Sequence, residues 1–258
     1  MDKKVILILV DGMRPDGLMQ CGNPYVQELL EKSAYTLNAQ TVFPSVTLPC
    51  HMSLFLSVDP ARHGITTNLF MPPVRPIEGL MERLDTRDKH TAFFITWERL
   101  RDLARPNRLA HSLFINQGKV KNTDRKITDA AIRYINEENP DFMFLYLGET
   151  DDRGGHDAGW MSETYLQVVN DAMDCVKRVQ EEISAEYDII VMADHGGHDR
   201  SHGTDMPEDM TIPIVCCGPS FTPGQLPDGI SIKDVAPTIV KMLGATPAPE
   251  WEGKPFIE

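Results

Sequence analysis

Short, uninterrupted apolar runs alternate along the chain with amphipathic segments of helical length. The first run, residues 5–10, reads Val-Ile-Leu-Ile-Leu-Val and predicts a buried strand over residues 3–10. The other runs predict strands at residues 36–43, 91–96, 141–147, 187–192 and 212–216. Apolar positions at helical spacing predict helices at residues 23–33, 49–58, 77–85, 124–138, 162–184 and 234–243.

The strands are continuous apolar runs rather than alternating ones, which is typical of strands that are buried on both faces. We therefore expect an α/β fold with a mostly parallel central sheet flanked by helices on both faces. Residues 69–121 are less regular and include stretches rich in proline and arginine. We expect them to form a small cap inserted into a single domain of residues 1–258.

Composition and charge narrow the class of protein. The 258 residues are 41% hydrophobic and 24% charged, which is ordinary for a globular protein, and the net charge is −13. An acidic surface repels nucleic acid polymers and anionic membranes, so neither is an expected partner. The longest purely apolar run has six residues, far short of the roughly 20 that span a membrane, and we expect a cytoplasmic protein.

Carboxylates and imidazoles follow several predicted strands, at the sheet edge where ligands bind in α/β folds. Aspartate and histidine are ligands of zinc and manganese, and two ions a few ångströms apart serve phosphoryl transfer. Bound ions would also supply the positive charge that an acidic chain needs to hold an anionic substrate. The candidate residues are Asp11, Asp151, Asp152, His156, Asp194, His195 and His202, with His198 as a supporting group.

A hydroxyl residue precedes the predicted helix at residues 49–58. Thr47 would lie beside free backbone N–H groups at the positive end of the helix dipole, which suits an anionic phosphate. The local sequence slightly favours a simpler role for Thr47 as the N-cap of that helix. Ser45 is a second candidate hydroxyl, so the residues alone leave the nucleophile open.

Seven motifs in a fixed order resemble one known family. They are residues 8–16 (Ile-Leu-Val-Asp-Gly-Met-Arg-Pro-Asp), residues 43–49 (Phe-Pro-Ser-Val-Thr-Leu-Pro), residues 63–68 (His-Gly-Ile-Thr-Thr-Asn), residues 155–156 (Gly-His), residues 193–196 (Ala-Asp-His-Gly), residues 201–204 (Ser-His-Gly-Thr) and residues 232–239. Together they resemble the type I phosphodiesterase/nucleotide pyrophosphatase family of the alkaline phosphatase superfamily. The resemblance implies an alkaline phosphatase-like fold that holds two divalent metal ions, zinc or alternatively manganese.

The resemblance also implies roles for single residues. One ion would be held by Asp11, Thr47, Asp194 and His195, and the other by an aspartate of the Asp151–Asp152 pair, His156 and His202. Thr47 would be the nucleophile. The Asn68 amide and the Leu48 backbone N–H would bind the phosphoryl oxygens.

Two departures from the family pattern affect these assignments. The usual Asp-x-x-Gly-His spacing selects Asp152, whereas counting from the strand selects Asp151 and makes Gly154 an inserted residue. We favour Asp151 and keep Asp152 as the alternative. Leu48 stands where nucleotide-cleaving relatives often have an aromatic residue, which weakens the expectation of a nucleotide substrate.

The expected activity is metal-dependent cleavage of phosphodiester or pyrophosphate bonds in a small phosphate ester, through a phosphothreonine intermediate on Thr47. The alternatives on the same metal site are a phosphomonoesterase, a phosphonate hydrolase or a mutase, which would need a cationic clamp from Arg14, Arg62 or Arg153. A metal-binding protein without catalysis is the least favoured reading. No feature of the sequence indicates an oligomeric state.

Overall fold

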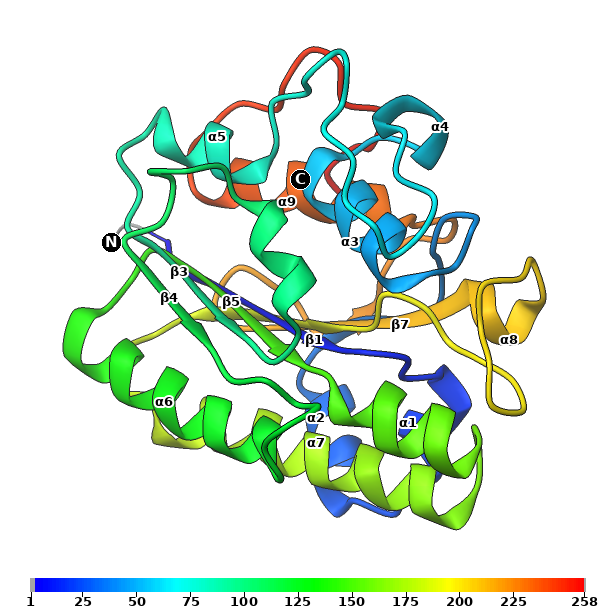
Figure 1. Cartoon of the computed structure of the whole chain (residues 1–258). Coiled ribbons are helices and arrows are strands. Elements are labelled where there is room, and N and C mark those ends of the chain that lie inside the picture. Colours follow the sequence, from blue (N-terminus) through cyan, green and yellow to red (C-terminus); the bar gives the residue numbers. More distant parts are fainter. Residues whose placement is uncertain (1–2, 258) are drawn as a thin grey trace.

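A single mostly parallel sheet organises the fold (Figure 1). The computed structural model describes residues 3–257, in which eight strands follow the order β4-β3-β5-β1-β6-β7-β2-β8 and β7 alone runs antiparallel to its neighbours. The strands are β1 (Val5–Val10), β2 (Ala34–Gln40), β3 (Thr91–Ile95), β4 (His111–Phe114), β5 (Phe142–Leu147), β6 (Asp188–Met192), β7 (Thr211–Cys217) and β8 (Gly224–Gln225). The predicted fold class is confirmed.

Helices cover both faces of the sheet (Figure 1). On one face are α1 (Pro15–Gln20), α2 (Pro24–Glu31), α6 (Thr123–Glu138) and α7 (Glu163–Glu182). On the other are α3 (Thr47–Leu56), α4 (Pro60–His63), α5 (Leu80–Asp85) and α9 (Val235–Met242). The short helix α8 (Pro207–Met210) immediately precedes β7, and two 3₁₀ segments are η1 (Glu98–Leu103) and η3 (Ile232–Asp234). Ser162 is the N-cap of α7 and accepts a hydrogen bond from the backbone N–H of Tyr165. No helix among residues 3–257 is long and apolar enough to cross a membrane.

The central strands explain why polar residues converge on one edge. Every residue of β1, β5 and β6 is buried, as continuous apolar runs predict. Val10 pairs with Leu147, and Leu9 pairs with Met192, so the three strands end at the same level. The residues that follow these strands therefore leave the sheet side by side.

Residues 69–121, which we predicted to be a cap, contribute directly to the central sheet. Strands β3 and β4 lie within this segment and pair in parallel with each other, and β3 pairs with β5. Their apolar side chains, such as Phe93 and Phe94, extend the hydrophobic core. The buried strand β3 is part of the core and cannot belong to a separate surface cap. Only the parts of this segment that surround the two strands lie outside the sheet.

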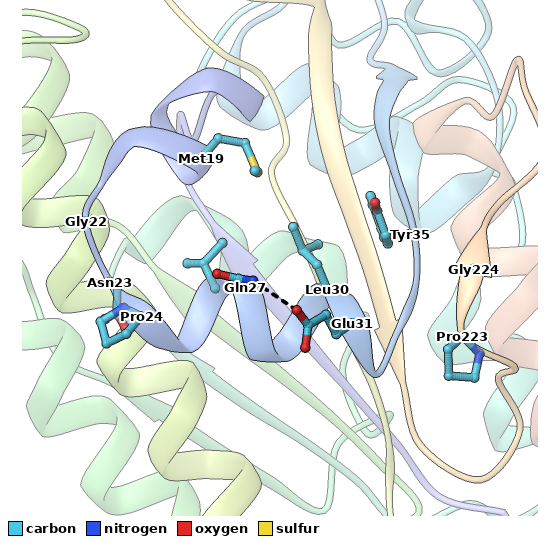
Figure 2. Close-up of a pocket in the computed structure, with 11 residues that line it drawn as sticks. Met19, Gly22, Asn23, Pro24, Gln27, Leu30, Glu31, Tyr35, Pro223 and Gly224 are labelled. Carbon is cyan, nitrogen blue, oxygen red and sulfur yellow. Dashed lines mark hydrogen bonds between the residues drawn. The ribbon is translucent and has the colours of Figure 1, made fainter.

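A pocket of about 690 Å³ lies beside α2 and the start of β2 (Figure 2). Its lining includes Met19, Leu30, Tyr35 and Pro223, and it contains none of the predicted metal ligands.

Candidate active site

Three buried carboxylates lie together beyond the ends of β1, β5 and β6. Asp11 follows β1, Asp194 follows β6, and Asp151 lies in η2 (Thr150–Ala158), the helical segment after β5. One oxygen of each carboxylate, namely Asp11 Oδ1, Asp151 Oδ1 and Asp194 Oδ2, is buried without any hydrogen-bond partner. Buried carboxylate oxygens without a partner are costly, so the arrangement calls for a bound cation.

Three imidazoles complete this group. In each, the Nδ1 atom donates to a backbone carbonyl, so that Nε2 is the ring nitrogen that can act as a ligand. The carbonyl partners are Gly196 for His195 (2.7 Å), Ser45 for His202 (2.8 Å) and Arg200 for His156 (3.0 Å). We call Asp11, Asp151, His156, Asp194, His195 and His202 the carboxylate–imidazole cluster.

The cluster offers two overlapping sets of metal ligands. Asp11, Asp194 and His195 form one set, and Asp151, His195 and His202 form the other, each with its ligand atoms within 4.8 Å of one another. His156 Nε2 lies 3.5 Å from Asp151 Oδ2 and adds a ligand to the second set. Nitrogen and oxygen donors of this kind suit zinc and manganese, so the residues fit the predicted divalent metal ions.

The geometry of η2 distinguishes between Asp151 and Asp152 as candidate metal ligands. This segment is π-helical, and a π-turn holds one residue more than an α-turn. The extra residue brings Asp151 onto the same side as His156, although the two are five positions apart. Asp151 Oδ1 also lies 3.7 Å from His202 Nε2, whereas Asp152 is half-buried and belongs to neither ligand set.

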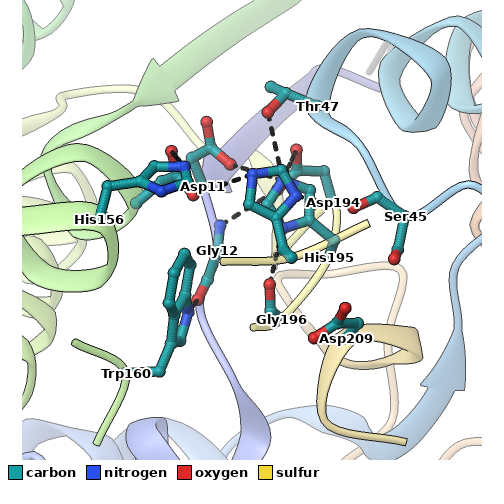
Figure 3. Close-up of polar contacts among 12 residues, drawn as sticks. Asp11, Gly12, Ser45, Thr47, His156, Trp160, Asp194, His195, Gly196 and Asp209 are labelled. Atoms are coloured by element: carbon teal, nitrogen blue, oxygen red, sulfur yellow. Dashed lines mark hydrogen bonds and ion pairs between the residues drawn. The ribbon is translucent and has the colours of Figure 1, made fainter. Parts of the chain in front are cut away.

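Thr47 directs its hydroxyl at the cluster (Figure 3). It is the first residue of α3, and Val46 is the N-cap, so the local interpretation of Thr47 as an N-cap is wrong. Its Oγ1 atom lies 3.2 Å from His195 Nε2, which accepts its hydrogen bond. Ser45, by contrast, donates its hydroxyl to the carbonyl of Thr204 at 2.7 Å.

Asn68 lies beside the start of α3. Its Oδ1 atom accepts the Leu48 N–H at 2.9 Å, so that N–H is occupied in this structure. The Leu48 side chain is fully buried in the core. Arg99, at the start of η1, donates to the carbonyl of Asn68. The side-chain amide of Asn68 is thus held next to Thr47 by contacts from two elements.

Burial and mutual repulsion shift the pKa values of the three aspartates. Burial raises the pKa of Asp11 well above its usual range, and the charges of Asp194 and Asp151 raise it further. Burial also raises the pKa of Asp151, to about 6, although His202 and His156 oppose the shift. Burial tends to raise the pKa of Asp194 as well, but the neighbouring His195 and His51, together with hydrogen bonds to Asp11 and Gly12, outweigh it and lower that pKa.

These pKa values predict that protons compete with metal ions for the cluster. With its pKa near 6 in the metal-free protein, Asp151 is mostly protonated at pH 5 and mostly ionised at pH 7. We expect the protonation of Asp151 to lower the apparent zinc affinity by about tenfold between pH 7 and pH 5. Zinc titrations against a chelating dye at pH 5, 6 and 7 measure this, and an affinity independent of pH over that range would contradict it.

Several supporting residues were missed in the sequence. The Tyr146 phenol donates to Asp11 Oδ2, and Tyr146 is the one polar-tipped side chain within the apolar run of β5. His51, one turn after Thr47 on α3, donates to the carbonyl of Thr47 at 2.7 Å and lies 3.4 Å from Asp194 Oδ2. Both signals were present in the sequence, as a tyrosine in a buried strand and a histidine one turn after the threonine.

His198, predicted as a supporting group, acts on the loop that carries His202. Its Nδ1 atom donates to Asp209 Oδ1 at 2.7 Å. The other carboxylate oxygen of Asp209 accepts both the N–H and the hydroxyl of Thr204, two residues beyond His202. The hydrogen bond from His198 to Asp209 is the main reason that the pKa of His198 is raised.

Two family models match the chain. Residues 5–82 match type I phosphodiesterase / nucleotide pyrophosphatase, and residues 107–247, more than half of the chain, match the metalloenzyme superfamily. The chain belongs to the metalloenzyme superfamily. The resemblance to type I phosphodiesterases found in the sequence motifs is confirmed, and the superfamily and the two ligand sets together support the use of divalent metal ions.

Two curated proteins are similar in sequence to parts of this chain. Ectonucleotide pyrophosphatase/phosphodiesterase family member 1 of Homo sapiens is 24% identical over 219 residues, which are 74% of this chain and 23% of that protein. A 2,3-bisphosphoglycerate-independent phosphoglycerate mutase of Clostridioides difficile (strain 630) is 25% identical over 182 residues, 65% of this chain and 34% of that protein. The chain therefore spans about a third or less of the length of these relatives.

A solved structure shares the fold over nearly the whole chain. An inactive variant of murine ectonucleotide pyrophosphatase / phosphodiesterase 5, in complex with AMP, superposes with a TM-score of 0.79 at 16% identity and covers 96% of each chain. At this identity the similarity concerns the fold, and it agrees with the alkaline phosphatase-like architecture expected from the sequence.

Proposed function

We propose that this protein is a two-metal phosphoric ester hydrolase that cleaves phosphodiester or pyrophosphate bonds in a small substrate through a phosphothreonine intermediate on Thr47. The observation that carries the proposal is the hydroxyl of Thr47, which lies at the start of α3 and 3.2 Å from His195 Nε2. A hydroxyl in this position meets the positive end of a helix dipole on one side and the cluster on the other. The murine neighbour with bound AMP and the phosphodiesterase relatives support a small phosphate ester as substrate.

The cluster residues would hold two divalent ions, with zinc as the first candidate and manganese as the second. Asp11, Thr47, Asp194 and His195 would bind one ion, and Asp151, His156 and His202 the other. When bound, the ions would supply Lewis-acid stabilisation of charge and lower the pKa values of the attacking groups. The carboxylate oxygens without hydrogen-bond partners, and the Nδ1 hydrogen bonds that leave Nε2 of each histidine as its ligand atom, support this assignment.

Thr47 would attack phosphorus through Oγ1 after losing its proton. The new Oγ1–P bond forms as the bond from phosphorus to the leaving oxygen breaks, and the leaving group departs with its electron pair and takes up a proton. Water then attacks phosphorus, the Oγ1–P bond breaks, and Thr47 regains its proton. The Asn68 amide, together with the Leu48 N–H once released from Asn68, would bind the phosphoryl oxygens as charge develops.

The surroundings of the cluster favour a diester over a monoester. A monoester carries an additional negative charge that a cationic clamp would balance. Each arginine proposed for that clamp has other contacts: Arg14 is paired with Asp16, Arg153 with Glu149, and Arg62 with the carbonyl of Arg75. None of the three is within hydrogen-bond distance of a cluster residue in residues 3–257.

We therefore expect the zinc-loaded protein to hydrolyse bis-p-nitrophenyl phosphate with a kcat/KM at least about tenfold above that for p-nitrophenyl phosphate. Both rates are read from p-nitrophenolate release under one set of conditions, with metal-free protein as the control. A preference for the monoester would overturn the diester assignment and favour a phosphatase, phosphonate hydrolase or mutase. Bound metal without hydrolysis of either ester would instead support a catalytically silent protein.

A further inference from the structure

The indole ring of Trp160 lies against one side of the carboxylate–imidazole cluster, beside Gly12 and His156 (Figure 3). It meets the imidazoles of His156 and His202 edge-on, at centroid distances of 5.3 and 5.9 Å. Its Nε1 atom donates to the carbonyl of Gly12 at 2.9 Å, directly after Asp11. One side chain thus contacts two ligands of the second metal set and the turn that carries a ligand of the first.

Two glycines allow the indole to lie against the backbone on either side. A β-carbon at Gly155 would come within 2.4 Å of the Trp160 ring, and one at Gly197 within 2.2 Å. Gly155 directly precedes His156, and Gly197 follows His195 by two residues. Any side chain at either position would displace the indole or the adjoining histidine, because packed interiors have no room for such overlap.

The carbonyl of Gly12 is held from two directions. It accepts the indole N–H of Trp160 and the hydroxyl of Tyr165, each at 2.9 Å. The N–H of Gly12 donates to Asp194 Oδ1 at 3.2 Å, and its φ of +67° places it in the left-handed region that favours glycine. The two peptide groups that flank the α-carbon of Gly12, the residue after Asp11, are therefore both fixed by buried hydrogen bonds.

From these contacts we propose that Trp160 is a positioning residue that fixes Asp11 relative to His156 and His202, and so sets the arrangement in which the two metal ions bind. The proposal rests on the proposed two-metal function. Outer residues that orient metal ligands commonly change metal affinity when they are substituted. A substitution at Trp160 is therefore expected to act on metal binding itself, which can be measured without any substrate.

The test compares Trp160→Phe with Trp251→Phe. Phenylalanine keeps an aromatic ring at position 160 but removes the N–H that holds Gly12. Trp251 is a matched control, since its indole also donates to a backbone carbonyl, that of Glu78 at 2.7 Å, outside the cluster. We expect Trp160→Phe to weaken zinc binding about 10- to 100-fold in competition with a chelating dye, and Trp251→Phe to leave it unchanged.

Unchanged zinc affinity in a folded Trp160→Phe protein would overturn the proposal. If that variant does not fold, a Trp97→Phe/Trp251→Phe double variant leaves Trp160 as the one tryptophan of the chain. Zinc should then produce a saturable change in its fluorescence, and a spectrum that zinc leaves unchanged would overturn the proposal equally. A wild-type protein that binds zinc without hydrolysing any ester would refute the proposed function. The effect of Trp160→Phe on zinc affinity would still test the proposed role of Trp160, because that measurement needs no substrate.

Discussion

Replacement of Thr47 by alanine is expected to lower kcat for bis-p-nitrophenyl phosphate by at least about 10³-fold. The substitution removes the only hydroxyl that the structure directs at His195 among residues 3–257. Water would have to attack the substrate directly, without the covalent step. Zinc binding should persist, because the carboxylates and imidazoles of the cluster remain in place. Stopped assays of product release and a zinc titration on the same preparation measure both effects.

Thr47→Ser is the matched control for this substitution. Serine keeps the hydroxyl and loses one methyl group, so it should retain part of the activity and accept a phosphoryl group from substrate. A phosphorylated residue at position 47 can be trapped by acid quenching and located by mass spectrometry. Turnover by Thr47→Ala near that of the wild type would refute the nucleophile assignment. It would also refocus attention on Ser45, whose hydroxyl bonds to Thr204 in this structure.

The convergence of the carboxylates could be predicted because it follows from strand patterns. Continuous apolar runs identify buried parallel strands, and the residues after such strands lie at one edge of the sheet. This reasoning placed Asp11 and Asp194 beside each other although they are far apart in the chain. The register of β1 with β5 and β6 is the physical reason that it succeeded.

Features that depend on the surrounding structure could not be predicted in the same way. The edge strand β4 (His111–Phe114) is half-exposed and only four residues long, so it has no continuous apolar run. The role of Trp160 depends on its approach to Gly12, which is distant in the sequence. The hydroxyl direction of Thr47 depends on Val46 being the N-cap, a one-residue shift in the start of α3 that local sequence does not determine.

The π-helical form of η2 likewise could not be predicted from residue type, and it decides between two adjacent aspartates. Asp151 lies within 3.7 Å of His202 and 3.5 Å of His156, while Asp152 remains outside both ligand sets. The pair therefore offers two nearly identical substitutions, Asp151→Asn and Asp152→Asn. Each removes one negative charge with almost no change in volume.

We expect Asp151→Asn to weaken zinc binding at the second set of ligands more than about 100-fold, because a neutral amide replaces a charged ligand oxygen. Diester hydrolysis should fall to a similar extent or further. Asp152→Asn should change both quantities by less than about threefold. Zinc stoichiometry by equilibrium dialysis and kcat/KM measured on both variants test the pair. The reverse ranking would show that the family spacing, counted back from His156, identifies the ligand, and that η2 adopts a different turn when metal is bound.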